Sequence, residues 1–80
     1  MARFYFDVRD AQFMTTDDVG TECTDRDDVS TEALRLLCMI GRDDPLSHLH
    51  NRFAVIVRDE SKRVVVIATA GLSVTWIDPA

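Results

Sequence analysis

Residues 3–9 read RFYFDVR, and apolar side chains alternate through this run. Phe4, Phe6 and Val8 fall on one side of an extended chain, and the residues between them fall on the other. Successive side chains of a β-strand point to opposite faces of the sheet, so this period of two predicts a half-buried strand. A polar turn and a weaker return strand over residues 13–16 would complete a hairpin.

The same pattern returns later in the chain. Phe4–Asp10 and Phe53–Asp59 both read F-x-x-x-V-R-D, and each precedes a turn. Shared hairpin chemistry explains this echo most simply, since Phe and Val at even spacing face inward and Asp begins the turn. Residues 53–58 are therefore predicted to form a third strand.

A fourth strand is predicted over residues 64–69, which read VVVIAT. The run is β-branched and apolar on both faces, which indicates a strand that lies centrally in the sheet or at a subunit contact. Gly71 interrupts the pattern, and Leu72, Val74 and Trp76 alternate beyond it. We expect the strand to bend or bulge at the glycine and then continue.

One amphipathic helix is predicted between the two hairpins. Its start falls at Thr24 or Asp25, because side chains of these types accept hydrogen bonds from the free backbone N–H groups of a helix. Gly41 and Pro45 are expected to end it. Its apolar stripe recurs at helical spacing and is wide enough to cover a sheet. The stripe consists of Val29, Ala33, Leu36, Leu37 and Ile40.

The order of elements is ββαββ, which indicates an α+β fold in a single domain over residues 1–80. We expect two layers, a four-stranded, mainly antiparallel sheet with one helix packed on one face. A single helix covers one face only, so the other face is expected to be partly apolar and open to a second copy of the chain. Self-association adds burial to so small a domain, which also favours a homodimer. The possible interface residues are Tyr5, Ile56, Val65, Ile67 and Trp76.

Two of the predicted strands, the turn after the first hairpin and part of the helix resemble a known family. The chain reads RFYFDVRD over residues 3–10, DVGTE over 18–22, EAL over 32–34 and FAVIVRDE over 53–60. These stretches are similar to the small proteobacterial proteins grouped as domain-of-unknown-function family 6894, which usually have a glycine where this chain has Ala11. The resemblance covers most of the chain. It implies a small α/β fold, with no assigned activity and no catalytic residues.

The charge balance bears on the choice of partner. Fourteen acidic residues against nine basic ones give a net charge of -5, and the basic residues are spread along the chain. Nucleic acid and anionic membranes are therefore disfavoured as partners, whereas a basic protein is permitted. The opening residues lack a signal-peptide pattern and the longest apolar run is too short to span a bilayer, so we expect a cytoplasmic protein. Cys23 and Cys38 are expected to be free structural thiols.

Two groups of residues raise the question of a metal site. Three acidic pairs offer the oxygen ligands that calcium and magnesium prefer, but none fits an EF-hand loop, and capping or solvation accounts for them. They are Asp17–Asp18, Asp27–Asp28 and Asp43–Asp44. His48 and His50 have the spacing of a zinc or copper pair, for which Cys38, Asp43 or Asp44 could supply a third ligand. Solvated histidines in a polar connector explain the pair more simply, so we predict no metal and no cofactor.

Motifs for catalysis are missing from the sequence, which has no G-x-S-x-G, P-loop or H-E-x-x-H pattern and only three glycines. We therefore predict that the protein is not an enzyme and has no catalytic residue. The two hairpins could instead bring four charged residues to one edge, where they would dock a partner or form ion pairs. This possible polar docking cluster consists of Arg9, Asp10, Arg58 and Asp59.

The function that we expect is a non-enzymatic protein–protein interaction or regulatory module that acts as a homodimer. The uncovered sheet face and the negative charge favour this class. One alternative is a small metal-binding protein or enzyme that uses the acidic pairs with His48 and His50. Another is an antitoxin-like or nucleic-acid-associated regulator, in which the acidic chain would mask a basic nuclease.

Overall fold

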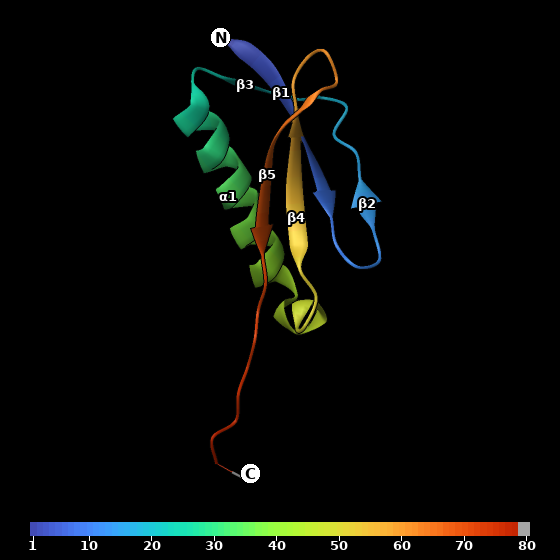
Figure 1. Ribbon diagram of the computed structural model, residues 1–80, viewed down its shortest axis with the longest axis vertical. Coiled ribbons are helices and arrows are strands. Elements are labelled where there is room, and N and C mark those ends of the chain that lie inside the picture. The colour runs from blue at the N-terminus through green and yellow to red at the C-terminus, as the bar shows by residue number, and fades with distance from the viewer. Residues whose placement is uncertain (79–80) are drawn as a thin grey trace.

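A computed structural model describes residues 1–78 and has two layers, a helix packed against one face of an antiparallel sheet (Figure 1). The predicted α+β class and ββαββ order are confirmed, with one short additional strand before the helix. The elements are β1 (Ala2–Arg9), β2 (Met14–Thr15), β3 (Thr21–Cys23), α1 (Arg26–Asp43), the 3-10 helix η1 (Pro45–His48), β4 (Phe53–Arg58) and β5 (Val64–Ala70).

The main path of the sheet has the strand order β2-β1-β4-β5, and its pairings are antiparallel. The register places Phe6 opposite Val57 and Val8 opposite Val55, so the apolar side chains of both strands face the helix. Of the two positions predicted for residues 64–69, the central one is excluded, because β5 pairs with β4 alone in the described sheet and forms an edge. The other, a subunit contact, stays a prediction. Both faces of β5 are apolar, but they have different surroundings. One face packs toward the helix, and the other lies open to solvent.

Two short strands pair with the other edge of β1. β2 pairs with Val8 and Arg9 and forms the predicted hairpin, while β3 pairs with residues 2–4. The sequence did not predict β3, because three residues are too few to show a periodic pattern. Cys23, the last residue of β3, is buried in the core.

The helix begins where the sequence predicts. Asp25 is its N-cap, and the Asp25 Oδ1 atom accepts a hydrogen bond of 2.8 Å from the backbone N–H of Asp28. The Asp28 carboxylate in turn accepts a hydrogen bond of 2.9 Å from the backbone N–H of Thr24. The two side chains therefore satisfy two free donors at the start of the helix reciprocally.

The predicted end of the helix is right for Pro45 and wrong for Gly41. α1 continues through Gly41 to Asp43, and Pro45 begins η1. Gly41 allows close packing instead of ending the helix, since a Cβ atom there would lie 3.3 Å from the Phe53 ring. No helix within residues 1–78 is both long and apolar enough to cross a membrane.

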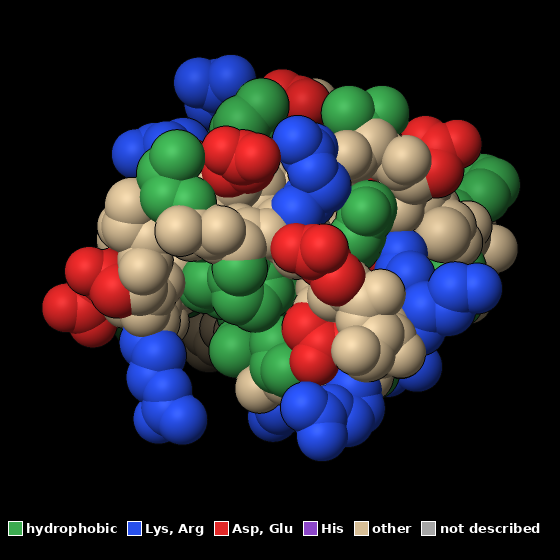
Figure 2. All heavy atoms as spheres, turned by 90° about the horizontal axis from the view of Figure 1, so that it is seen from above, with side chains coloured by type: hydrophobic (Ala, Val, Ile, Leu, Met, Phe, Trp, Pro, Cys, Tyr) green, Lys and Arg blue, Asp and Glu red, His purple; other side chains and the backbone are tan. Residues whose placement is uncertain are grey.

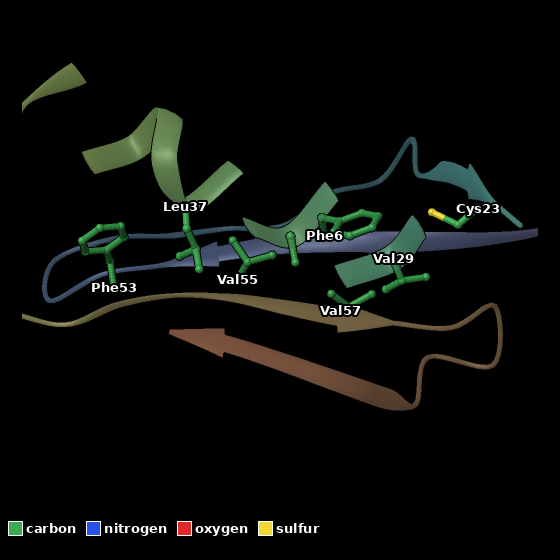
Figure 3. Packing of buried hydrophobic residues seen from close by; sticks show 8 residues of the cluster. Phe6, Cys23, Val29, Leu37, Phe53, Val55 and Val57 are labelled. Atoms are coloured by element: carbon green, nitrogen blue, oxygen red, sulfur yellow. The ribbon is translucent and has the colours of Figure 1, made fainter. Parts of the chain in front are cut away.

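The core lies between α1 and the inner face of the sheet, the face that the helix covers (Figure 3). Side chains from the central strand β4 meet side chains from the helix there, and β1 contributes from the side. Burial of a large apolar side chain stabilises the fold by roughly 1.5–3 kcal/mol. The buried cluster consists of Phe6, Cys23, Val29, Ala33, Leu37, Phe53, Val55 and Val57.

Residues 71–78, which we call the arm, lead away from the body of the molecule (Figure 1). The prediction that a strand continues past Gly71 is wrong, since β5 ends at Ala70 and an isolated bridge between Leu49 and Leu72 is the only pairing described beyond it. The physical reason is that no described strand runs beside the arm, so its backbone has no ladder to join.

Candidate functional site

The sheet face opposite the helix, here called the outer face, is divided into a buried half and an exposed half. On β1 and β4 the outer side chains Asp7, Ala54 and Ile56 are buried, with exposed fractions of 4%, 6% and 8%. On β5 the outer side chains Val65 and Ile67 are 44% and 59% exposed. The uncovered apolar face that the sequence predicts is therefore limited to β5.

The buried half contains an ion pair. Arg58 Nε lies 2.7 Å from Asp7 Oδ2, and Arg58 Nη2 lies 3.0 Å from Asp7 Oδ1. The same Nη2 donates a hydrogen bond of 2.9 Å to the backbone oxygen of Asp17, and the guanidinium lies over the Tyr5 ring, 5.3 Å from its centroid. This forked contact gives both buried charges several partners.

Asp17 connects the ion pair to the edge of β1. Its Oδ2 atom accepts a hydrogen bond of 3.0 Å from the backbone N–H of Phe6, in the gap between the residues of β1 that pair with β2 and those that pair with β3. Its own backbone N–H donates to Asp7 Oδ1 at 2.9 Å. The Asp17 side chain thus takes the place of a neighbouring strand at this point of the edge.

The members of this network favour one another's ionised forms. The hydrogen bond from Arg58 lowers the pKa of the Asp7 carboxyl, and the same contact raises the pKa of Arg58. Burial raises the pKa of Asp17, but its backbone N–H donors, Phe6 foremost among them, outweigh burial and bring the pKa below its usual value. The network is therefore charged and paired at neutral pH.

The four residues of the predicted docking cluster do not come together. β1 and β4 are antiparallel, so Arg9 and Arg58 lie at opposite ends of their register, about 13 Å apart along the strands. Asp10 and Asp59 each accept two backbone hydrogen bonds within their own turns, and these bonds lower the pKa of both carboxyls. The two aspartates thus shape turns at separate ends of the sheet.

The residues considered for a metal site are also placed apart. His48 is 7% exposed, and its ring centroid lies 4.5 Å from that of Phe53, so it packs as part of the core edge. His50 has a φ of 65° in the turn that follows η1. Among residues 1–78, no three His, Cys, Asp or Glu side chains are grouped as a metal ion would require. Of the acidic pairs, Asp17 belongs to the ion-pair network and Asp28 to the helix cap.

The exposed half of the outer face continues into the arm. β5 pairs with β4 on one edge, and no residue of the described chain pairs with its other edge. From Val64 to Ile77 the sequence contains neither a charged residue nor a proline. Natural edge strands commonly carry such residues, or a covering element, to prevent pairing with another chain. This edge is unpaired and carries neither a charged residue nor a proline, and it is the candidate functional site.

The five predicted interface residues divide between these regions. Tyr5 is partly buried beneath Arg58, and Ile56 is buried in the centre of the sheet, so neither offers much surface. Val65 and Ile67 lie exposed on the outer face of β5. Trp76 is 78% exposed in the arm.

A groove of about 750 Å³ opens at the end of the molecule where α1 begins. Phe4, Val29 and Val66 line it with apolar surface, and Asp25 and Ser30 add polar groups. Figure 2 looks onto this end and shows hydrophobic side chains beside a recess, with acidic and basic side chains around them. The groove cannot be predicted from the sequence, because its lining comes from separate elements that no local pattern connects.

Comparison with protein-family models identifies a match over most of the chain. Residues 3–71 match a family described as a domain of unknown function (DUF6894). The match contains the helix and nearly all of the sheet, and it ends at the glycine where the arm begins. Searches of curated proteins and of solved structures find no match.

Proposed function

Since the chain belongs to the family of domains of unknown function DUF6894, whose description names no activity, we propose its function from its exposed surface. The protein is a non-enzymatic interaction module that acts as a homodimer. The observation that carries this proposal is the unpaired, uncharged edge of β5. The net charge of -5 favours a basic protein as the partner of the dimer, and the free thiols of Cys23 and Cys38 suit the reducing cytoplasm of a bacterial cell.

The edge of β5 is complementary to itself. Antiparallel pairing with β5 of a second copy joins the two sheets, and full overlap of the seven-residue strand places Ile67 opposite its own counterpart. Val65 then lies opposite Thr69 of the second copy on the same outer face. Cross-strand apolar pairs of this kind each contribute roughly 0.2–1 kcal/mol, in addition to the new backbone hydrogen bonds.

The distribution of charge supports contact at this edge. Two copies with the same net charge of -5 repel each other, so a contact must keep their acidic groups apart. The stretch from Val64 to Ile77 contains no charge, and the acidic residues lie in the N-terminal half, the connectors, the turn before β5 and at Asp78, just beyond the stretch. Association through β5 therefore brings together the part of the surface with the least repulsion.

A lysine in the middle of the strand tests the proposal. Ile67→Lys places two like charges opposite each other in the paired strands and is expected to convert the dimer to a monomer. Because Ile67 is already 59% exposed, the substitution should leave the fold intact. Sedimentation velocity across the micromolar range measures the oligomeric state, and circular dichroism checks the fold.

The matched control is Leu34→Lys, which adds the same charge at a helix position that is 56% exposed. This variant is expected to remain a dimer. A wild-type chain that sediments as a monomer throughout the range would overturn the proposal, as would an Ile67→Lys variant that stays dimeric.

A further inference from the structure

We infer that the dimer exchanges arms, so that Leu72, Val74 and Trp76 of one copy occupy the groove beside α1 of the other copy. This inference rests on the proposed dimer and names the segment that completes its contact. It accounts for two features that the isolated chain leaves without a partner, an apolar arm in solvent and an unfilled groove.

The arm exposes large apolar side chains. Val74 is 57% exposed, Trp76 78% and Ile77 90%, although such side chains ordinarily lie in a core or an interface. Contacts at the base of the arm set its direction. Leu72 forms a parallel bridge with Leu49, and its backbone oxygen accepts a hydrogen bond of 3.5 Å from the His50 N–H. The arm consequently leads away from the body, as Figure 1 shows.

The arm cannot reach the groove of its own chain along this path. The groove is lined by Val65 and Val66 at the start of β5, whereas the arm begins after Ala70 at its end. The strand between these points spans about 17 Å, and the arm extends in the opposite direction from the groove. The two features therefore lie at opposite ends of the longest axis, which measures 53 Å.

Antiparallel pairing of β5 brings the arm and the groove of different copies together. With Ile67 opposite its counterpart, Ala70 of one copy lies opposite Val64 of the other. The arm then continues beyond Val64 of the second copy, toward the end of the molecule where Phe4, Asp25 and Val29 line the groove. The symmetry makes the contact reciprocal, so each copy gives an arm and receives one.

The side-chain alternation also fits. Val66, Ala68 and Ala70 of β5 pack on the helix side of the sheet. In a chain that continues extended, Leu72, Val74 and Trp76 keep this even-numbered series and point to the same side. The two-fold axis of an antiparallel strand pair is perpendicular to the sheet, so both helices and both grooves lie on that side.

The chemistry of the groove suits a tryptophan. Phe4, Val29 and Val66 provide an apolar lining for the ring, and the Asp25 carboxylate at the start of α1 offers an acceptor for the indole N–H. A buried tryptophan contributes about 150–250 Å², so two arms supply about 300–500 Å² from Trp76 alone. A stable interface buries about 1,600 Å² in total, and two paired edges by themselves fall short of it.

Trp76 is the only tryptophan of the chain, so its fluorescence reports on the arm directly. In the dimer, the emission maximum is expected at shorter wavelength than in the monomeric Ile67→Lys variant, because the groove excludes water from the indole. Trp76→Ala is expected to weaken dimerisation about 30-fold in Kd, the effect of a tryptophan hot spot.

Two arginine substitutions on the helix locate the binding site. Ser30→Arg puts a long side chain into the groove, while the sequence of the arm is unchanged. Because this side chain blocks the indole, the Trp76 emission is expected to shift back to longer wavelength. Thr31→Arg is the matched control, since Thr31 is the adjacent exposed residue and does not line the groove. It should leave the emission of the dimer unchanged.

The outcomes separate this inference from the proposed function. A chain that dimerises through Ile67 while Trp76 emits as in the monomer refutes the exchange of arms and keeps the dimer. Emission at shorter wavelength that responds equally to Ser30→Arg and Thr31→Arg also refutes it, because the indole would then lie outside the groove. A wild-type chain that stays monomeric refutes both the exchange of arms and the proposed dimer.

Discussion

Asp7 and Arg58 are charged residues at buried or nearly buried positions of the two inner strands. Each charge alone would be unfavourable there, because desolvation disfavours an unpaired ion. Together with Asp17 they form a satisfied network, and among residues 1–78 no buried side-chain nitrogen or oxygen lacks a hydrogen-bond partner.

Asp7→Ala is expected to lower the free energy of unfolding by about 2 kcal/mol at neutral pH, because the Arg58 side chain and the Asp17 N–H lose a charged, buried acceptor. The pKa of Asp7 in the folded chain lies below the ordinary value of 3.8, so the unfolded chain binds more protons in acid. The contribution of Asp7 is complete above pH 3.8 and is lost as the pH falls through the lowered value. Denaturant titrations at neutral pH and at about pH 3 should show a smaller acid loss in the variant.

Glu32→Ala serves as the control for this prediction. Glu32 pairs with Arg35 on the exposed surface of α1, where an ion pair contributes about 0–1 kcal/mol. If Asp7→Ala costs no more stability than Glu32→Ala, the network does not have the structural role assigned to it.

At the scale of a whole element, the side chains at the start of α1 determine where the helix begins. Asp25 and Asp28 occupy the N-cap and the third helical position, and each accepts a hydrogen bond from a backbone N–H that the helix leaves free. Carboxylates at this end also interact favourably with the helix dipole. The local sequence therefore determines where the helix begins, and the helix ends directly before Pro45, while Gly41 within it lies close to the Phe53 ring.

Asp25→Ala is expected to lower the free energy of unfolding by about 1 kcal/mol, because the Asp28 N–H loses its acceptor. Asp27→Ala is the control, since Asp27 lies in the same turn but does not cap, and it should cost roughly 0.3 kcal/mol. Both are best measured by urea denaturation in the Ile67→Lys background, so that dimerisation does not contribute. Equal losses at the two positions would contradict the capping role.

At the scale of the whole molecule, the arm makes the chain more extended than a compact domain. The radius of gyration is 14.6 Å, whereas a compact domain of this length has about 12 Å. The excess follows from residues that extend along the 53 Å axis without packing on the body. An exchange of arms would convert this extension into buried contact.

Dimerisation predicts a melting temperature that depends on protein concentration. Above Kd, a tenfold increase in wild-type concentration is expected to raise Tm by roughly 3–5 °C, because association stabilises the folded state by mass action. The Ile67→Lys variant should melt at one temperature throughout. Differential scanning fluorimetry across the micromolar range measures both, and a concentration-independent wild-type Tm would contradict the dimer.

Local alternation was enough to predict β1, β4 and β5, and the cap at Asp25 was readable from residue types alone. These predictions succeeded because each depends on the neighbours of a residue along the chain. Of the predicted interface residues, Val65, Ile67 and Trp76 are exposed, and their place in an interface stays a prediction.

The sequence by itself therefore determined the class of the fold, the order of its elements and the apolar character of β5. Only the tertiary structure decided that β5 lies at an edge, that Asp7 meets Arg58 while Arg9 lies far from it, and that a groove opens beside α1. The physical reason is that strand order, register and cavities arise from contacts between residues distant in the chain, and local periodicity does not encode which of them meet.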